Sequence, residues 1–322
     1  MAGDFALETA EIELLISPSA HDGGSPKPAT STVHAQVAGL SHPGKVRPTN
    51  EDHFLVSRVR RDQQILATNV PQKDLPGLIS DEGYLMVVAD GMGGMAAGEV
   101  ASRLAITTGL KLVQKSAKWG FKINQKEARE LVERVNHQLQ EIDRVLTDRG
   151  YSDRRLFGMG TTLTAAYSAG VDLFVFHVGD SRAYLHRKGE LRRLTKDHTV
   201  AQAMADAGYI APDEVRTHNK RNALTNFLGG HSGKVKADVR WLRLADGDRL
   251  LVCSDGLTEM IEDDAIAKIL SQSSTPSQAA QALIDQALEK GGRDNITVIV
   301  SRYTVPTGLD TLADDKGTDP SP

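Results

Sequence analysis

The sequence predicts an α+β fold in which antiparallel sheets carry helices on their faces. Short apolar runs of strand length occur along most of the chain, and longer helical repeats lie between some of them without regular alternation. Segments 184–186 and 191–193 flank Lys188-Gly189, a spacing typical of two strands joined by a short turn. A doubly wound fold requires strands and helices to alternate, so antiparallel sheets with helices packed on them are favoured.

The strands are expected where apolar residues alternate with polar ones or form short runs. The first begins at Val33, because apolar and polar residues alternate through Val37. Further strands are expected to end or start at four positions: Ala89, Val178, Cys253 and Ile296. Apolar residues recur at helical spacing within 128–146 and within 283–288, and a third helix is expected from Ala97 onward.

The composition is that of an ordinary globular protein. The 322 residues are 40% hydrophobic, enough to bury a core without disulfides or a structural metal. A net charge of −4 offers no basic surface to nucleic acid, and the single cysteine, Cys253, excludes an internal disulfide. No apolar run reaches the length of a membrane span, and the acidic start of the chain is unlike a signal peptide. We therefore expect a cytoplasmic monomer that binds neither membrane nor nucleic acid.

The chain divides into an ordered body and two polar ends. Residues 1–32 are expected to be a flexible N-terminal extension and linker, because 21–32 is rich in Gly, Pro, Ser and Thr. Docking of the acidic and apolar segment before this linker, on the domain or on a partner, is the alternative. The body spans 33–304, and residues 305–322 are expected to form a disordered tail. The stretch 61–83 is longer than a tight hairpin requires and is a candidate for a variable loop near the functional site.

Four aspartates stand where apolar strands enter or leave the predicted sheets: Asp90, Asp180, Asp255 and Asp294. Any one of them alone is explained as a helix cap or a turn residue. As a set they bring several carboxylates to strand ends, and like charges that meet there require a cation. Oxygen ligands favour Mg²⁺ or Mn²⁺, and the sequence has no zinc-binding motif. Gly91, which follows Asp90, would let its own carbonyl approach such an ion.

The glycine-rich loop after Asp90 does not match a nucleotide-binding loop. A Rossmann loop needs an acidic residue about 20 positions further on, and the window around 110–112 contains none. A Walker loop needs Gly-Lys followed by Ser or Thr, which is absent there.

A second charged group lies upstream in GKVRPTNEDHF. Arg47 offers a planar guanidinium suited to a phosphoryl group. Glu51 and Asp52 can supply two further carboxylates. For this segment taken alone, a surface turn of mixed charge is the alternative.

Six segments, in this order, resemble the motif series of the metal-dependent PP2C-type serine/threonine protein phosphatases in their bacterial form. They are RPTNEDHF, VVADGMGGMAAGEVAS, GMGTTLTAA, VFHVGDSRAYLHRKGELRRLTKDHT, LLVCSDGL and GGRDNITVIV. The resemblance covers about 33–303. It implies a four-layer αββα sandwich, with two central antiparallel sheets flanked by helices and metals in a cleft at one edge. It also implies a flap subdomain at about 197–230, for which a plain surface excursion is the alternative.

The resemblance further implies roles for the charged residues at this cleft. It assigns six residues to metal binding: Glu51, Asp90, Gly91, Asp180, Asp255 and Asp294. Asp90 would bridge two Mg²⁺ or Mn²⁺ ions, and Asp180 with Asp255 would hold a third ion that occurs in bacterial members. Arg47 would bind the phosphate and Asp52 would orient a metal-bound water, so that Arg47, Asp52 and Asp90 are the expected catalytic residues.

The expected activity is hydrolysis of phosphoserine and phosphothreonine in proteins by a metal-bridging water or hydroxide, with Arg47 and the ions holding the phosphoryl oxygens. Such an enzyme would oppose serine/threonine protein kinases in signalling, and its partners would include such a kinase. Met92 departs from the eukaryotic pattern, which has a histidine there, so the leaving group must take its proton from another source.

Two other functions stay open on the sequence. A pseudophosphatase would keep the fold as a binding module, which the presence of every expected metal carboxylate disfavours. A binuclear hydrolase of small phosphoesters would use the same residues, and a comparison of a phosphopeptide with a small phosphoester distinguishes it.

Overall fold

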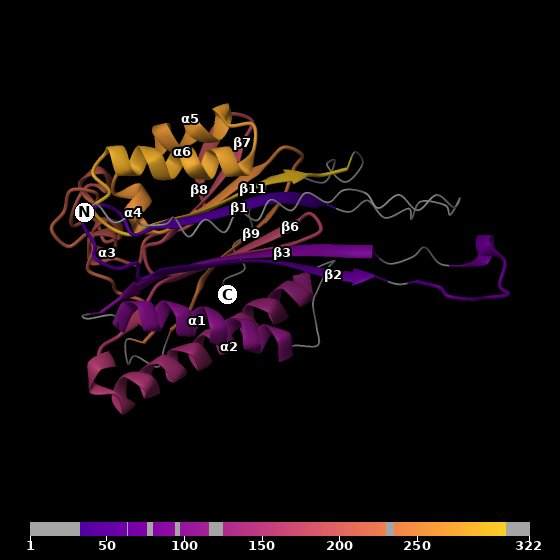
Figure 1. Ribbon diagram of the computed structural model, residues 1–322, viewed down its shortest axis with the longest axis horizontal. Helices are drawn as coiled ribbons and strands as arrows, with labels where there is room; N and C mark the ends of the chain where they lie inside the picture. The colour runs from indigo at the N-terminus through magenta and orange to yellow at the C-terminus, as the bar shows by residue number, and fades with distance from the viewer. Residues whose placement is uncertain are drawn as a thin grey trace, which may run out of the picture.

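Two antiparallel sheets form the centre of the protein, and helices cover the outer face of each (Figure 1). The computed structural model describes residues 33–62, 64–75, 80–93, 97–115, 125–229 and 235–306. The expected flexible extension, 1–32, and residues 307–322 of the expected tail lie outside this part.

The first sheet has five strands and the second has six, and their pairings are antiparallel. The first sheet contains, in spatial order, β1 (His34–His42), β11 (Ile296–Thr304), β10 (Arg249–Cys253), β7 (Arg182–Arg187) and β8 (Glu190–Arg193). The second contains β2 (Asp52–Asp62), β3 (Ser80–Met92), β5 (Leu163–Ala169), β6 (Asp172–Val178) and β9 (Asp238–Arg243), with β4 (Gly160–Thr161) paired to the end of β3.

Six α-helices and three short 3₁₀ helices complete the described part. They are α1 (Ala97–Lys115), α2 (Gln125–Ser152), α3 (Val200–Asp206), α4 (Asp255–Thr258), α5 (Asp263–Gln272) and α6 (Pro276–Glu289), with η1 (Gln72–Asp74), η2 (Arg154–Leu156) and η3 (Pro212–Glu214). The start of α6 shows why a helix begins there: the Thr275 side chain accepts from the Gln278 backbone N–H, and Pro276 occupies the first turn. In these ranges, none of the helices combines the length and apolar character needed to cross a bilayer.

The alternation of side chains along β6 shows how the layers form. Leu173 and Val175 face the first sheet, while Phe174 and Phe176 face α1 and α2. A third buried cluster, which includes Leu283 of α6, lies between the first sheet and α4–α6. The result is the α+β four-layer αββα sandwich that was expected. The predicted strands and helices are confirmed, except that β3 continues past Ala89 to Met92.

The stretch 61–83 corrects one expectation. It contains the far end of the β2–β3 hairpin, where Asp62 pairs with Ser80, whereas Asp52 pairs with Asp90 at the other end. Ten residue pairs separate the two ends, about 33 Å at the rise of a strand. In Figure 1 this loop projects from the side of the molecule opposite α3 and α4. It is not near the candidate site, because a long regular hairpin carries it away.

A buried ion pair connects the two sheets at this opposite end. Arg187, at the end of β7, donates to both carboxylate oxygens of Asp248 at 2.8 and 2.7 Å. Its guanidinium also donates to the Arg243 carbonyl of β9, at 2.6 Å. Asp248 is fully buried and also accepts from the Ala245 backbone N–H.

We expect Asp248→Asn to lower the free energy of unfolding by about 3 kcal/mol, because it removes the charge of a fully buried carboxylate that pairs with the partly buried Arg187 guanidinium. Glu141→Gln, which removes one of the two surface partners of Arg144, should change it by less than about 1 kcal/mol. Urea denaturation of both variants measures the difference. Equal effects would contradict the structural role of the Arg187–Asp248 pair.

Candidate active site

One end of the sandwich collects the expected charged residues, because antiparallel strands alternate their ends. β2 begins there with Asp52, β3 ends there after Asp90, and the β6–β7 turn that contains Asp180 crosses between the sheets. In the first sheet, β10 ends before Asp255 and β11 begins after Asp294. Residues up to 247 positions apart in sequence therefore meet in one region.

Asp90 lies at the centre of the carboxylate group. It stands directly opposite Asp52 in the β2–β3 pairing, and the charge of Asp255 also acts on it. Desolvation, followed by the negative charges of Asp52, Asp255 and Asp180, raises the pKa of Asp90 well above its ordinary value. Desolvation and the Asp180 charge likewise raise the pKa of Asp255.

Asp52 is buried and incompletely hydrogen-bonded. Its Oδ2 accepts from the Ser254 hydroxyl at 2.7 Å, while its Oδ1 is buried without a hydrogen-bond partner in the described residues. Desolvation is the main cause that raises the pKa of Asp52 to about 6, and desolvation followed by the Asp197 charge raises that of Asp180 to about 7. Several carboxylates thus lie in surroundings that disfavour their charged forms.

Arg47 and Glu51 border this group. Arg47 donates to Asp294 at 2.6 Å, and this hydrogen bond is the main cause that raises the pKa of Arg47. About half of the Arg47 side chain is exposed, so its guanidinium faces both the carboxylates and solvent. Desolvation raises the pKa of Glu51, while the Arg47 charge opposes the rise.

Asn295 holds the segment that carries Glu51. Its Oδ1 accepts from the Glu51 backbone N–H at 2.7 Å, and its Nδ2 donates to the carbonyls of Pro43 and Thr49, both at 2.9 Å. The sequence interpretation noted Asn295 only as the neighbour of Asp294. Its role escapes sequence reasoning because all three partners lie more than 240 positions away.

Thr162 joins the loops of Asp90 and Asp180. Its hydroxyl accepts from the Asp90 backbone N–H at 3.1 Å and bonds the Ser181 hydroxyl at 2.9 Å. His198 supports the same turn: its Nδ1 accepts from the Gly179 N–H at 3.1 Å, and its Nε2 lies 3.1 Å from Asp238. Thr162 lies in the segment GMGTTLTAA, and His198 lies in KDHT at the end of the fourth segment. The sequence drew attention to both segments but predicted no role for these two residues.

Two glycines allow the backbones to meet. A Cβ on Gly91 would lie 2.1 Å from the Gly98 carbonyl oxygen, and one on Gly256 would lie 1.9 Å from that of Asn295. Larger residues would push α1 or β11 away from the carboxylates.

The expected flap, about 197–230, is described up to residue 229; it contains α3 and η3 and contacts the site through side chains. Asn222 donates to Glu259 at 2.8 Å, and Arg216 pairs with Glu262 at 3.0 Å. Its two ends meet where the Thr225 N–H donates to the His198 carbonyl at 2.8 Å.

The structure thus brings together all the expected site residues: Arg47, Glu51, Asp52, Asp90, Gly91, Asp180, Asp255 and Asp294. It gathers them through pairwise contacts. In the described ranges, no three His, Cys, Asp or Glu side chains are arranged as a ready coordination shell.

An αββα sandwich with carboxylates at one end of both sheets is the architecture expected of PP2C-type phosphatases. The sequence profile of the protein phosphatase 2C family matches residues 64–290. The serine/threonine protein phosphatase PstP of Mycobacterium tuberculosis is 38% identical over 217 residues, 67% of this chain and 40% of that protein. The serine/threonine phosphatase stp of Listeria innocua is 36% identical over 231 residues, 71% of this chain and 89% of that protein. The chain belongs to the protein phosphatase 2C family.

A solved structure agrees with this assignment. The catalytic domain of PstP in complex with two manganese ions is similar with a TM-score of 0.65 and 32% identity, covering 84% of this chain and 99% of that one. The chain spans about 40% of the full length of the M. tuberculosis relative. The profile match contains Asp90, Asp180 and Asp255, while the segments around Arg47 and Asp294 fall outside it and are placed by the structure.

We expect Asn295→Ala to lower the free energy of unfolding by about 2–3 kcal/mol, because it leaves the Glu51 N–H and two carbonyls without their partner. Asn222→Ala, which removes one exposed hydrogen bond to Glu259, should cost less than about 1 kcal/mol. Urea denaturation compares them. A loss no larger for Asn295→Ala would contradict its holding role.

His177 predicts a pH dependence of stability. Desolvation lowers the pKa of this buried imidazole to about 3, while its Nε2 donates to the Lys196 carbonyl. Below pH 6.5 the unfolded chain binds a proton at this histidine that the folded chain does not bind. The free energy of unfolding therefore decreases as the pH is lowered, by up to about 1.4 kcal/mol per pH unit, until about pH 3. The stability difference between the native chain and His177→Gln should shrink by about 2 kcal/mol from pH 7 to pH 5. If the free energies of unfolding of the two proteins changed in parallel with pH, the predicted contribution of His177 would be contradicted.

Proposed function

We propose that residues 33–304 form a metal-dependent protein serine/threonine phosphatase domain. The observation that carries this proposal is the Asp90 group: several mutually destabilising carboxylates beside a half-exposed guanidinium, at one end of a PP2C-type sandwich. The names of the relatives support the reaction class, since they are serine/threonine phosphatases.

The residues present fit divalent cations. Their donor atoms are oxygens, the buried Asp52 Oδ1 lacks a partner among the described residues, and the charges of Asp52, Asp255 and Asp180 raise the pKa of Asp90. We assign Mg²⁺ or Mn²⁺ to six ligands: Glu51, Asp90, the Gly91 carbonyl, Asp180, Asp255 and Asp294. Bound ions of this kind lower the pKa of a coordinated water and offset the charge of phosphoryl oxygens.

The residues of the chain would then position the substrate. Arg47, now paired with Asp294, would turn its planar donors to the phosphoryl oxygens once a cation offsets the Asp294 charge. Asp52, held by Ser254 and shielded from solvent, would orient the attacking water through its unpartnered oxygen. Met92 has a thioether side chain, which donates no proton. We therefore assign protonation of the leaving group to another group.

Substrates and setting belong to the same proposal. The half-exposed Arg47 and the adjoining segment 197–229 suit a phosphoserine or phosphothreonine on a protein surface, and such an enzyme would counteract a protein kinase in signalling. We propose that the domain acts in the cytoplasm as a monomer and binds neither nucleic acid nor membrane. The net charge of −4 supports the exclusion of nucleic acid.

We expect phosphate release from a phosphothreonine peptide in Mn²⁺ or Mg²⁺, no release with chelator, and a loss of at least about a hundredfold in Asp255→Asn. Asp148→Asn, an exposed carboxylate on α2, is the matched control and should retain full activity. If the folded protein released no phosphate with either metal, the domain would be assigned as a binding module and not as a phosphatase. Release from a small phosphoester alone would indicate a small-molecule hydrolase.

Asp180→Asn tests the role of the third ion independently of the other two. We expect turnover to fall more than affinity for the first two ions, because Asp180 belongs to the turn between the sheets and not to the paired strands that carry Asp52 and Asp90. Steady-state kinetics with Mn²⁺ titration measures both quantities. Unchanged turnover would remove Asp180 from the mechanism.

A further inference from the structure

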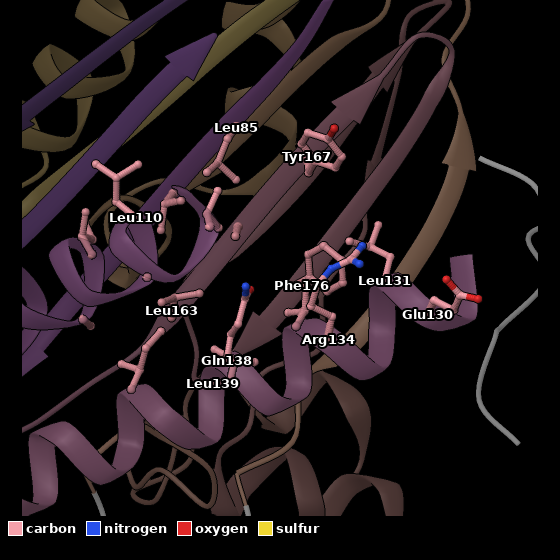
Figure 2. Close-up of a pocket in the computed structure, with 18 of the residues that line it drawn as sticks. Leu85, Leu110, Glu130, Leu131, Arg134, Gln138, Leu139, Leu163, Tyr167 and Phe176 are labelled. Carbon is pink, nitrogen blue, oxygen red and sulfur yellow. The ribbon is translucent and has the colours of Figure 1, made fainter. Parts of the chain in front are cut away.

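A groove of about 440 Å³ lies between α1, α2 and the outer face of the second sheet (Figure 2). Its walls are apolar and include Leu85, Leu131 and Phe176. The strand residues that line it face α1 and α2, whereas the candidate active site lies at strand ends. The groove is therefore a separate feature of the fold.

Arg134 of α2 brings a positive charge into these apolar surroundings. It is partly buried, and it forms no ion pair or hydrogen bond with any residue in the described ranges. Figure 2 shows its side chain directed from α2 toward the strand that carries Phe176. Burial raises the pKa of Tyr167, another lining residue, and the Arg134 charge opposes that rise, so this charge acts inside the groove.

A guanidinium is charged at every physiological pH, and a desolvated charge without a partner is costly. The ligand that matches the groove is therefore an anion that also carries apolar groups. The rim contains acids as well, but the Glu130 carboxylate points away from the groove in Figure 2.

The chain itself contains such a ligand in residues 4–16. Apolar and acidic side chains are interleaved there: Phe5, Leu7, Ile12, Leu14, Leu15 and Ile16 with Asp4, Glu8, Glu11 and Glu13. No lysine or arginine precedes Lys27. The segment therefore offers carboxylates to Arg134 without a competing cation of its own.

The segment joins the domain beside the end of β2 that lines the groove, but on the opposite face of the same sheet, and β2 is the edge strand of that sheet. His34, at the start of β1, lies 3.8 Å from Glu82, and Arg60 lies 3.3 Å from the same carboxylate. The next residue, Arg61, lines the groove. The linker 21–32 can span about 40 Å when extended, several times the spacing of about 10 Å between packed sheets.

We propose that residues 4–16 dock in this groove of their own chain. The apolar side chains fill the space between α1, α2 and the sheet, and a carboxylate pairs with Arg134. The tether supplies an effective concentration in the millimolar range, so a weak isolated affinity suffices.

Thiol labelling of the full chain tests this proposal. Cys253, the only native cysteine, is buried, and burial raises its pKa to about 12, so it does not react. A cysteine introduced by Gln138→Cys reports on the groove, and one introduced by Gln140→Cys, exposed on the same helix, is the matched control. The maleimide reaction rate is measured for each in the native chain and in two variants of the segment: Glu8, Glu11 and Glu13 replaced by Gln, and Leu14 and Leu15 replaced by Ser.

We expect the Gln138→Cys thiol to react about tenfold faster in either segment variant than in the chain with the native segment. Adding Arg134→Ala to the chain with the native segment should have the same effect, and the Gln140→Cys rate should not change in any of them. Arg129→Ala, an exposed arginine of the same helix outside the groove, should have no effect. The segment variants leave the domain sequence intact, so their result does not depend on its folding.

Three results would overturn the proposal. A fast reaction in every chain would show an open groove. A slow reaction in every chain would show that another part of the protein covers it. Protection that grows with protein concentration would assign the groove to a second copy.

Discussion

The repulsion among carboxylates that meet at one end of both sheets is the constraint on which the rest of the site depends. Asp90 stands opposite Asp52, and the negative charges of Asp52, Asp255 and Asp180 add to desolvation in raising the pKa of Asp90. Such a group persists only if the surrounding structure fixes it and if protons or cations offset its charge. The fold must supply the fixation, and the compensation of charge is what gives the group its activity.

The fold meets the first requirement through rigid layers and a few directed hydrogen bonds. Side chains that alternate along strands such as β6 bury both faces of the second sheet, so the strand ends cannot move independently. Asn295 then ties the Glu51 segment to β11, and Thr162 ties the Asp90 strand to the turn of Asp180. At the opposite end, the Arg187–Asp248 pair and the Arg243 carbonyl hold the two sheets together.

The sequence was sufficient to predict what depends on local pattern. Runs ending at Val178 and Cys253 define strands by their own composition, and an aspartate after each strand is visible without any structure. The role of Asn295 and the pairing of Arg47 with Asp294 were not predictable, because their partners lie more than 240 positions away. The place of the 61–83 loop was predicted wrongly, since nothing local fixes the length of the β2–β3 hairpin.

The central claim is that this carboxylate group binds divalent cations. Isothermal titration of Mn²⁺ into the native chain and into Asp90→Asn tests it directly, because binding is measured without any assumption about substrate. We predict at least two bound ions for the native chain, with loss of most of this binding in the variant, because Asp90 lies opposite Asp52 and interacts with Asp255. No binding to the folded native chain, or equal binding by the two proteins, would contradict it.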